Sequence, residues 1–480
     1  MNTYVNSIKI LFEKWANERV VDIYPLSESG SNRKYYRISG TTKIAIGVFN
    51  PDINENRAYI SFTDHFFKKK LKVPHVYAHQ LMNNIYLIED FGDTTLYTIA
   101  EKEISAGSLS NETFELFKEA LKNLVRFQIK GGQGLDYSLC YPRDKFDKQS
   151  ILWDLNYFKY YFLKLAKISF NEQKMEGDFN TFSRILLSAD SEYFMYRDFQ
   201  SRNIMVRDGK IFFIDYQGGR KGALQYDVAS FIFQAKLNLS DKIREALLSF
   251  YLDELKKYIK VDARLFKKYY YSFVLIRILQ TLGTYGFRGY YENKAHFLLS
   301  IPYAIKNLKW MVENNHLPKN IPELTRSINL ILENESLNKI ESKNEKQKLK
   351  VAINSFSYKE GIPKDFTGNG GGFVFDCRSL ENPGRYPEYK NSTGKDSVVI
   401  NFLNNKNDVK EFLNSVYRIA DASVKTYIEK DFKNLMINFG CTGGQHRSVY
   451  CAENLARHLS QKFDIVIELN HSELLKKGFK

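Results

Sequence analysis

The stretch that decides the fold reads Tyr196-Arg197-Asp198-Phe199-Gln200-Ser201-Arg202-Asn203-Ile204-Met205-Val206, and Asp215-Tyr216-Gln217 follows it nine residues later. Apolar residues flank its polar centre, and Asp208-Gly209 predicts a tight turn before the apolar run 211–214 returns. This pattern predicts a loop followed by a hairpin. Asp198, Asn203 and Asp215 are therefore expected to converge at the mouth of the hairpin.

Such a convergence is what phosphoryl transfer requires. One carboxylate takes the proton of a hydroxyl group, and an amide with a second carboxylate holds the Mg²⁺ that bridges the phosphates. The spacing of Asp198 and Asn203, with Asp215 at the end of a hairpin, is typical of protein-kinase-like enzymes. The alternative is that Asp198 and Asn203 only cap a turn, but a simple turn does not explain Asp215.

The composition is that of a packed globular protein. A chain of 480 residues with 44% hydrophobic and 15% aromatic residues is long enough for two or three domains. Its four cysteines have neither disulfide nor zinc spacing. Residues 1–19 have helical periodicity without a long apolar core, which indicates a helix rather than a signal peptide. With no stretch apolar enough to span a membrane, we expect a cytoplasmic protein without a membrane partner.

The positive charge is unevenly distributed. Residues 351–480 carry 18 Lys and Arg against 15 Asp and Glu, so +12 of the formal net charge of +15 lies in residues 1–350. This excess would attract an anionic ligand such as ATP and also permits nucleic-acid binding. Most of these charges are explained by a solvated Lys-rich surface.

The pattern along the first 320 residues predicts a bilobal, protein-kinase-like domain. The turn 27–32 and the strand 43–49 indicate a small β-rich lobe, and small residues in such a turn let backbone N–H groups approach phosphates. A helix follows over 55–67, and 87–93 is expected to join the lobes. Further helices are expected at 112–130, 151–168, 240–260, 263–283 and 294–314. Asp227, at the start of another helix, is expected to cap it or to tether the catalytic loop.

The polar stretch 321–349 is predicted to be a linker between two domains, 1–320 and 350–480, with the boundary near residue 346. The second domain is expected to be a separate α/β phosphate-loop domain. The overall fold class is therefore α/β and α+β.

The first domain resembles the aminoglycoside phosphotransferase family, and within it the kinases of the anomeric hydroxyl of N-acetylmuramate and N-acetylglucosamine. The resemblance is carried by the central stretch with Asp215-Tyr216-Gln217, and by 30–37, 88–96 and 226–230. It implies that Asp198 is the catalytic base, that Asn203 and Asp215 hold Mg²⁺, and that ATP is the phosphoryl donor. The nucleotide-binding residues that it implies are Ser31, Asn32, Arg33, Arg37, Glu89, Asp90 and Phe91. Asp154 and Arg202 are candidates for contacting the sugar.

One expected residue is missing. The third strand of a kinase carries a lysine for the α- and β-phosphates, but residues 44–49 contain none. The sugar kinases named above also lack it, which favours that subgroup over a dead kinase. Arg33 or Arg37 is then expected to meet the phosphate charge.

The C-terminal part contains its own phosphate-loop motif. An apolar run at 435–439 leads into Gly440-Cys441-Thr442-Gly443-Gly444-Gln445-His446-Arg447-Ser448, and an amphipathic helix follows. Backbone N–H groups, a helix N-terminus and Arg447 can together bind an oxyanion. The spacing of Cys441 and Arg447 is also that of cysteine phosphatases, in which the thiolate attacks phosphorus. A buried, unreactive Cys441 is the third interpretation.

Residues 350–480 resemble the C-terminal domain of the RapZ family, which reports amino-sugar phosphate levels to RNA regulation. The match includes 355–363, 375–378, 381–383, 393–396 and the loop 440–450. It implies a site for an amino-sugar phosphate built from the loop Cys441–Ser448 together with Asp376 and Arg378. The N-terminal half of that family, with its phosphate loop, is replaced here by the kinase-like domain.

These observations predict an ATP- and Mg²⁺-dependent kinase that makes an amino-sugar 1-phosphate in cell-wall sugar recycling, with a second domain that binds an amino-sugar phosphate. Two alternatives stay open. One is an RNA-binding adapter in which the kinase fold is only a scaffold, and the other is a kinase of a different acceptor, such as an aminoglycoside.

Overall fold

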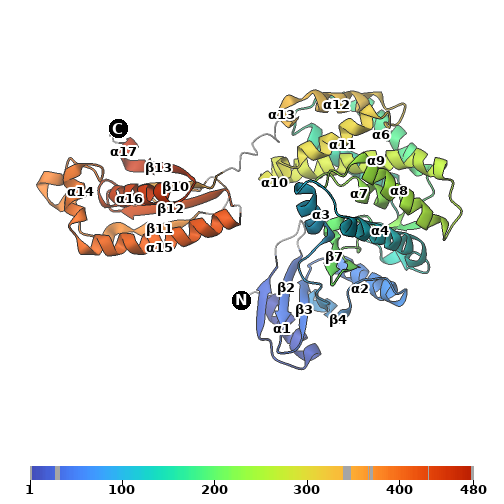
Figure 1. Cartoon of the computed structure of the whole chain (residues 1–480), viewed down its shortest axis with the longest axis horizontal. Helices are drawn as coiled ribbons and strands as arrows, with labels where there is room; N and C mark the ends of the chain where they lie inside the picture. Colours follow the sequence, from blue (N-terminus) through green and yellow to red (C-terminus); the bar gives the residue numbers. More distant parts are fainter. Residues whose placement is uncertain are drawn as a thin grey trace. The chain divides into compact units, whose positions relative to one another are not determined.

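The computed structural model describes residues 3–26, 33–338, 348–365, 367, 371–430 and 432–476. The chain forms two compact units, Met1–Glu341 and Ser342–Lys480 (Figure 1). The first has a β-rich small lobe and a larger helical lobe, and the second is an α/β unit with a parallel sheet. The predicted fold class is therefore confirmed. Within the described residues, no helix combines the length and apolar character needed to cross a membrane.

The small lobe is built on a five-stranded antiparallel sheet in the order β1-β2-β3-β5-β4. The strands are β1 Asp22–Pro25, β2 Lys34–Ser39, β3 Ile44–Phe49, β4 Val76–Gln80 and β5 Ile85–Ile88. Helix α1 (Thr3–Ala16) packs on one face, where a Cβ at Gly47 would lie 2.4 Å from Ile8 Cγ2. On the other face Tyr59 of helix α2 (Ile53–Lys68) joins the core of Ile46 and Val48. Both faces of β3 are therefore covered by apolar side chains.

The helical lobe is arranged around the long helix α9 (Ala263–Gly286), which contacts α5, α6, α7, α10 and α11. Its helices are α3 Leu96–Ser105, α4 Asn111–Arg126, α5 Lys148–Phe158, α6 Glu172–Leu187, α7 Leu224–Ile232, α8 Asp241–Lys256, α10 Ala295–Leu298, α11 Ile301–Glu313, α12 Pro322–Glu333 and α13 Glu335–Asn338. Helices α4, α5 and α9 continue into π-helical turns at Phe127–Gly131, Lys159–Leu163 and Phe287–Tyr291.

Two small two-stranded sheets carry the central stretch. Strand β6 (Tyr193–Met195) pairs antiparallel with β9 (Arg220–Gly222), and β7 (Ile204–Arg207) pairs with β8 (Lys210–Phe213). Asp208 and Gly209 connect β7 to β8 with φ angles of 52° and 69°. Both angles are those of a two-residue hairpin turn, for which Asp-Gly is a preferred sequence. The predicted hairpin is therefore confirmed.

The predicted linker begins too early. Helix α12 lies within 321–349, and its Leu324, Ile328 and Ile331 are fully buried. These three residues recur at helical spacing on one face, and α12 packs on α6 and α11. The polar residues between them hide this stripe in the sequence. The packed part of the first unit thus extends beyond residue 320.

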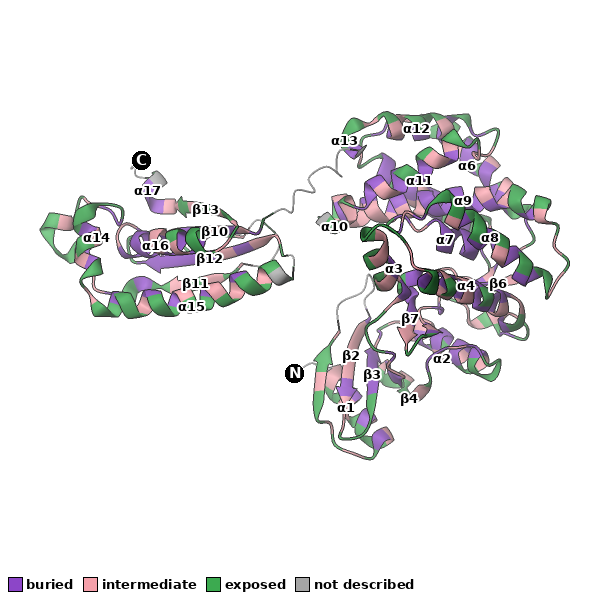
Figure 2. Ribbon diagram, viewed as in Figure 1, coloured by how far each residue is buried: buried purple, intermediate pink, exposed green. Residues whose placement is uncertain are grey.

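The second unit is a four-stranded parallel sheet in the order β11-β12-β10-β13. Its strands are β10 Lys350–Ser357, β11 Phe373–Asp376, β12 Asn434–Cys441 and β13 Val466–His471, and its helices are α14 Ser397–Asn404, α15 Asn407–Glu429, α16 Arg447–Lys462 and α17 Ser472–Lys476. The central strands β10 and β12 are the most buried, whereas α15 presents many exposed residues (Figure 2). The β12–α16 connection is the glycine-rich loop predicted to bind phosphate.

Candidate active site

Asp198, Asn203 and Asp215 come together at the β7–β8 hairpin. Asn203 is the last residue of the 3₁₀ turn Ser201–Asn203. Its Nδ2 donates to the backbone oxygen of Asp198 at 2.9 Å and to Oδ2 of Asp215 at 3.3 Å. The backbone N–H of Ile214 donates to Asn203 O at 3.1 Å, which ties the end of β8 to this turn. One amide therefore links the two aspartates, as the spacing predicts.

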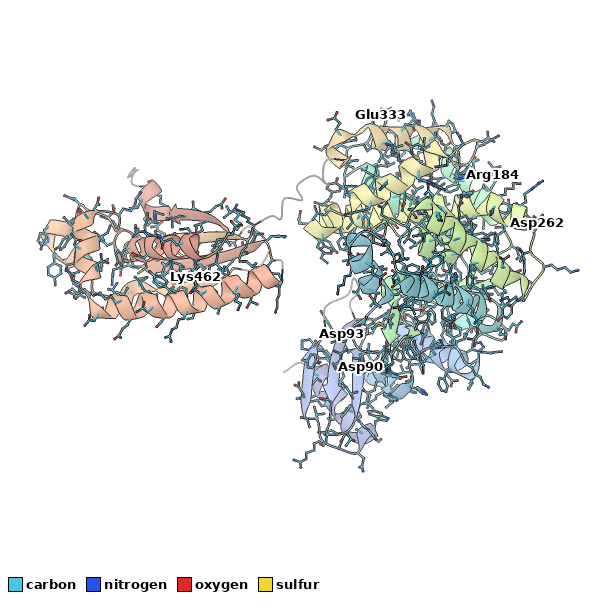
Figure 3. All side chains as sticks on the ribbon, in the orientation of Figure 1. Asp90, Asp93, Arg184, Asp262, Glu333 and Lys462 are labelled. Atoms are coloured by element: carbon cyan, nitrogen blue, oxygen red, sulfur yellow. The ribbon has the colours of Figure 1, made fainter. Side chains whose placement is uncertain are left out.

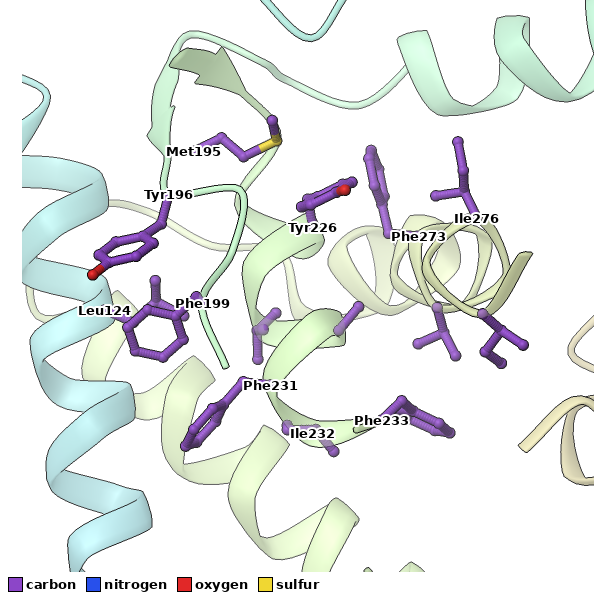
Figure 4. Close-up of a cluster of buried hydrophobic side chains, with 14 of the residues drawn as sticks. Leu124, Met195, Tyr196, Phe199, Tyr226, Phe231, Ile232, Phe233, Phe273 and Ile276 are labelled. Carbon is purple, nitrogen blue, oxygen red and sulfur yellow. The ribbon is translucent and has the colours of Figure 1, made fainter. Parts of the chain in front are cut away.

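The Asp198 carboxylate is partly exposed, and within the described part of the chain no donor pairs with it. The next residue, Phe199, is buried: its ring lies 5.2 Å from both Tyr196 and Phe231 of α7 (Figure 4). The apolar side chains therefore fix the loop while the carboxylate stays available. A carboxylate with free lone pairs is suited to accept a proton from a hydroxyl group.

Asp227 tethers the backbone of the catalytic loop. It is fully buried in the first turn of α7, and it accepts the backbone N–H of Tyr196 at 2.7 Å and that of Arg197 at 2.9 Å. Gln128 Nε2 donates to the same carboxylate at 3.3 Å. Burial raises the pKa of Asp227 to about 7, although the donated N–H bonds oppose the rise. Of the two structural roles expected for Asp227, the observed one is the tether.

Arg197 stabilises the loop through the contacts of its side chain. Its φ of 77° is strained for a residue with a side chain, and its guanidinium makes two hydrogen bonds to Asp154, at 2.7 and 2.9 Å. The guanidinium also lies 5.1 Å from the ring centres of Phe146 and Tyr226. Both oxygens of Asp154, a predicted sugar contact, are thus engaged inside the lobe. Arg202, the other sugar candidate, is exposed on the 3₁₀ turn.

Asp215 is surrounded by donors. Its φ is 68°, and its Oδ1 accepts Gln217 Nε2 at 2.7 Å and Arg33 Nη1 at 3.1 Å. Gln217 was absent from the residues predicted for the site, although its place two residues after Asp215 was a usable signal. Glu55, which binds Arg33, could not be found by any local pattern.

The chemistry of this site fits a hard cation such as Mg²⁺. Asp215 and Asn203 provide carboxylate and amide oxygens, and the Asp215 side chain is 38% exposed, so an ion can approach it. In the described ranges no group of three or more His, Cys, Asp or Glu residues could hold a metal. Mg²⁺ usually takes one or two protein carboxylates and fills its other positions with water and phosphate oxygens.

The predicted nucleotide residues fall into two places. Arg33, 6% exposed, pairs with Glu55 of α2 and with Asp215. Arg37 instead makes four hydrogen bonds of 2.6–3.0 Å to Asp90 and Asp93, which are labelled together in Figure 3. The two arginines therefore pair with different carboxylates, Arg33 beside Asp215 and Arg37 at the segment between the lobes. Ser31 and Asn32 lie outside the described residues.

The segment between the lobes is fixed from β7. Arg207 donates to Glu89 Oε1 at 3.1 Å and to the backbone oxygen of Asp90 at 2.9 Å. The Phe91 ring stacks on Phe212 of β8 with 4.2 Å between the ring centres. These contacts connect the predicted nucleotide-binding residues 89–91 directly to the hairpin of the catalytic residues.

In the second unit, Cys441 is the last residue of β12 and is only 3% exposed. Its Sγ lies 3.2 Å from Ser448 Oγ and accepts the backbone N–H of Gly444 at 3.2 Å. Gly444 has a φ of 64°, and a Cβ there would lie 2.9 Å from the backbone nitrogen of Ser357. Only glycine fits this turn without strain.

Arg447 and its neighbours support the surrounding loops. Arg447 is 5% exposed, and its Nη1 donates to the backbone oxygens of Arg378 and Leu380, both at 2.8 Å. His446 Nε2 lies 2.9 Å from Tyr389 O, and Gln445 Nε2 donates to Ser392 O at 2.8 Å. These three side chains, predicted to face a ligand, are turned towards residues 378–392.

The outer side of the loop is open. Thr442 and Gly443 are exposed, and a Cβ at Gly443 would meet no atom within 4 Å. Near Arg447, Asp376 and Arg378 form an exposed ion pair of 2.6 Å, and Arg378 lies over the Tyr358 ring at 4.0 Å. Of the predicted ligand residues, Thr442, Gly443, Asp376 and Arg378 are therefore the most exposed.

Comparison with known protein families gives two matches. Residues 22–260 match the phosphotransferase enzyme family, and residues 349–475 match the RapZ C-terminal domain. A nucleotide-binding protein of Thermosipho melanesiensis is 37% identical over 123 residues, which are 26% of this chain and 42% of that relative. The chain thus spans about two fifths of the length of the curated relatives that it matches.

Two solved structures are similar at low identity. An ethanolamine kinase of Plasmodium vivax is 13% identical, with a TM-score of 0.43 over 62% of this chain and 84% of that one. A choline kinase from Cryptosporidium parvum is 11% identical, with a TM-score of 0.43 over 63% of this chain and 92% of that one.

Proposed function

Because residues 22–260 belong to the phosphotransferase enzyme family and residues 349–475 form a RapZ C-terminal domain, we propose that the protein is an ATP-dependent kinase of a small-molecule hydroxyl group. The observation that carries this proposal is that the Asp198 carboxylate has no hydrogen-bond donor among the described residues and lies beside the linked pair of Asn203 and Asp215.

Each residue has a defined task in this reaction. Asp198 accepts the proton of the acceptor hydroxyl group as that oxygen attacks phosphorus. Asn203 and Asp215 would hold Mg²⁺, and the cation would neutralise phosphate charge when bound with ATP. Asp227 and the Arg197–Asp154 pair keep the loop in place, so that Asp198 does not need to be reoriented during the reaction.

The acceptor that we propose is an N-acetylated amino sugar, phosphorylated on its anomeric hydroxyl group. This proposal is supported by the sequence similarity of residues 30–37, 88–96 and 196–217 to such kinases, and by the presence of a RapZ-type domain in the same chain. Both domains would then act on one pool of cytoplasmic amino sugars.

A screen of acceptors tests this function. The full-length protein is incubated with ATP, Mg²⁺ and N-acetylmuramate, N-acetylglucosamine or an aminoglycoside, and ADP release and the phosphorus NMR spectrum of the product are measured. We expect turnover with an amino sugar and the signal of a 1-phosphate. Turnover only with the aminoglycoside would replace the acceptor, and no turnover with any compound would remove the proposal.

For the second unit we propose binding of an amino-sugar phosphate at the open side of the Cys441–Arg447 loop. Its accessible groups are Thr442, Gly443 and the Asp376–Arg378 pair. Calorimetric titration with glucosamine-6-phosphate tests binding, and kinase assays at the same concentrations test regulation. If turnover and ATP affinity do not respond, the domain does not regulate the kinase.

An RNA-binding adapter is the competing function, and the net charge of +12 in residues 1–350 favours it. Binding of structured RNA that weakens steeply with salt, together with absent turnover, would support the adapter over the kinase.

A further inference from the structure

The third strand of the small lobe lacks the usual kinase lysine. In protein kinases a lysine of the third strand pairs with a glutamate of the adjacent helix and contacts the nucleotide phosphates. In this protein β3 reads Ile-Ala-Ile-Gly-Val-Phe. Ala45 and Val48 are fully buried, and Gly47 lies against Ile8 of α1. A lysine at any of the four buried positions of β3, residues 45–48, would enter an apolar core.

A different cationic side chain, that of Arg33, reaches α2, the helix that corresponds to the one carrying the glutamate in protein kinases. Arg33 stands directly before β2, opposite the end of β3 in the antiparallel pair. Its Nη2 pairs with Oε1 of Glu55 in the first turn of α2, and its Nη1 lies 3.1 Å from Oδ1 of Asp215. Glu55 is fixed in turn, because its Oε2 accepts Asn50 Nδ2 at 2.9 Å. The Arg33 guanidinium thus joins α2 to Asp215, the proposed metal ligand.

The second candidate arginine pairs with a different set of carboxylates. Arg37 binds Asp90 and Asp93, each through two hydrogen bonds, at the segment between the lobes. Arg33 is also flanked by two carboxylates, but one of them, Asp215, is the proposed ligand of the Mg²⁺ that accompanies ATP, and the cation would take up its negative charge. Of the two arginines expected to meet the phosphate charge, Arg33 is the one beside Asp215.

We propose that Arg33 replaces the strand lysine: Glu55 holds one side of its guanidinium, and the side now facing Asp215 binds a phosphate of the nucleotide. The planar fork of arginine allows this, since its nitrogens can bind a carboxylate and a phosphate at the same time. Arg33 is then a nucleotide-binding residue, and Glu55 is its positioning residue. The inference rests on the proposed kinase function, because a phosphate must enter next to Asp215.

Nucleotide binding tests this role without any acceptor. The affinity of the full-length protein for the ATP analogue AMP-PNP with Mg²⁺ is measured by calorimetry for Arg33→Gln, Arg33→Lys and Glu55→Gln. The matched control is Arg57→Gln, which removes the same charge from an exposed position of α2. We expect Arg33→Gln to weaken binding by at least about tenfold, since a charge-assisted hydrogen bond is lost. Arg33→Lys should keep part of the affinity, and the control should keep all of it.

The double variant Arg33→Gln/Glu55→Gln separates binding from folding. Arg33→Gln alone leaves Glu55 and Asp215 without their shared cation and is expected to lower the melting temperature of the first unit. Removing the Glu55 charge as well should recover much of the melting temperature but not the nucleotide affinity. If the double variant binds AMP-PNP like the wild type, the ion pair is only structural and the inference is wrong.

The failure of this inference can be distinguished from the failure of the proposed function. Wild-type protein that does not bind AMP-PNP would remove the kinase proposal and, with it, the role of Arg33. Wild-type binding together with full affinity in Arg33→Gln would overturn only the role of Arg33.

Discussion

Two loops of this protein are each predicted from the sequence to act on phosphate groups, but in the structure their key side chains have different surroundings. In the first unit the loop at Asp198 buries its apolar residues, and within the part of the chain that the structure describes no donor is hydrogen-bonded to the carboxylate. In the second unit the loop at Cys441 buries the thiol itself, and Arg447 donates to two backbone oxygens.

The difference concerns which groups are free to react. A nucleophile or base must reach its substrate, and a phosphate-binding arginine must have donors to spare. The Asp198 loop meets this condition because Asp227 binds its backbone N–H groups and Asp154 binds Arg197. In the Cys441 loop, Arg447 itself stabilises the neighbouring backbone through its hydrogen bonds. The geometry therefore favours the structural, non-phosphatase interpretation of Cys441 and Arg447.

Substitution of the unpaired base should have the largest effect. Asp198→Asn keeps the shape of the side chain but cannot accept the proton, so turnover should fall by about 10²- to 10⁴-fold. Affinity for AMP-PNP should stay close to that of the wild type. The measurement is the rate of ATP-dependent phosphorylation of an amino sugar. Asp208→Asn, in the exposed hairpin turn, is the matched control, and an equal loss in both variants would contradict the role of Asp198.

Removing the tether should be the next largest change. Asp227→Asn replaces one accepting oxygen by an NH₂ group that faces backbone donors, so the free energy of unfolding should fall by about 3 kcal/mol. Denaturation followed by tryptophan fluorescence reports on the first unit, since Trp15, Trp153 and Trp310 all belong to it. A variant as stable as the wild type would show that the buried carboxylate does not hold the loop.

The same pair of proteins should differ in pH dependence. Burial raises the pKa of Asp227 from its ordinary value of 3.8 to about 7, so the folded protein keeps a proton that the unfolded chain has lost. The stabilisation from this proton is complete below about pH 4 and disappears as the pH rises through about 7. The stability difference between the wild type and Asp227→Asn should therefore shrink from pH 4 to pH 8. A difference that grows with pH would exclude the raised pKa.

A smaller loss of stability is expected in the second unit. Arg447→Gln leaves the backbone oxygens of Arg378 and Leu380 without their donor, which should cost about 1–3 kcal/mol. Hydrogen exchange of peptides from β12 and α16 measures this loss locally, with Arg457→Gln on the exposed side of α16 as the control. Unchanged protection combined with lost glucosamine-6-phosphate binding would reverse the comparison, because Arg447 would then serve a ligand.

The smallest effect is expected at the rim of that loop. The side chains of Asp376 and Arg378 are 45% and 51% exposed, so Asp376→Asn should change the free energy of unfolding by less than about 0.5 kcal/mol. If Arg378 contributes to the proposed phosphate site, glucosamine-6-phosphate should bind more tightly, since Arg378 loses a competing carboxylate. Weaker binding would indicate that Asp376 itself contacts the ligand.

Much of the fold could be predicted because its signals are local. The Asp208-Gly209 turn, the helical periodicity of α4, α8 and α9, and the glycine-rich turn before α16 each depend on neighbouring residues. The linker was predicted to begin too early because three apolar residues of α12 are dispersed among polar ones. Burial of that stripe depends on α6 and α11, which no local window contains.

The sequence by itself determined the spacing of Asp198, Asn203 and Asp215, and the glycines that allow the Cys441 loop to turn. Only the tertiary structure decided which side chains are free. Arg33 meets Asp215 across 182 residues, and Arg447 reaches Arg378 across 69. Whether a charged group is available for a ligand depends on whether a distant carboxylate or carbonyl has already paired with it. That pairing exists only when the chain has folded and water has been excluded from around it.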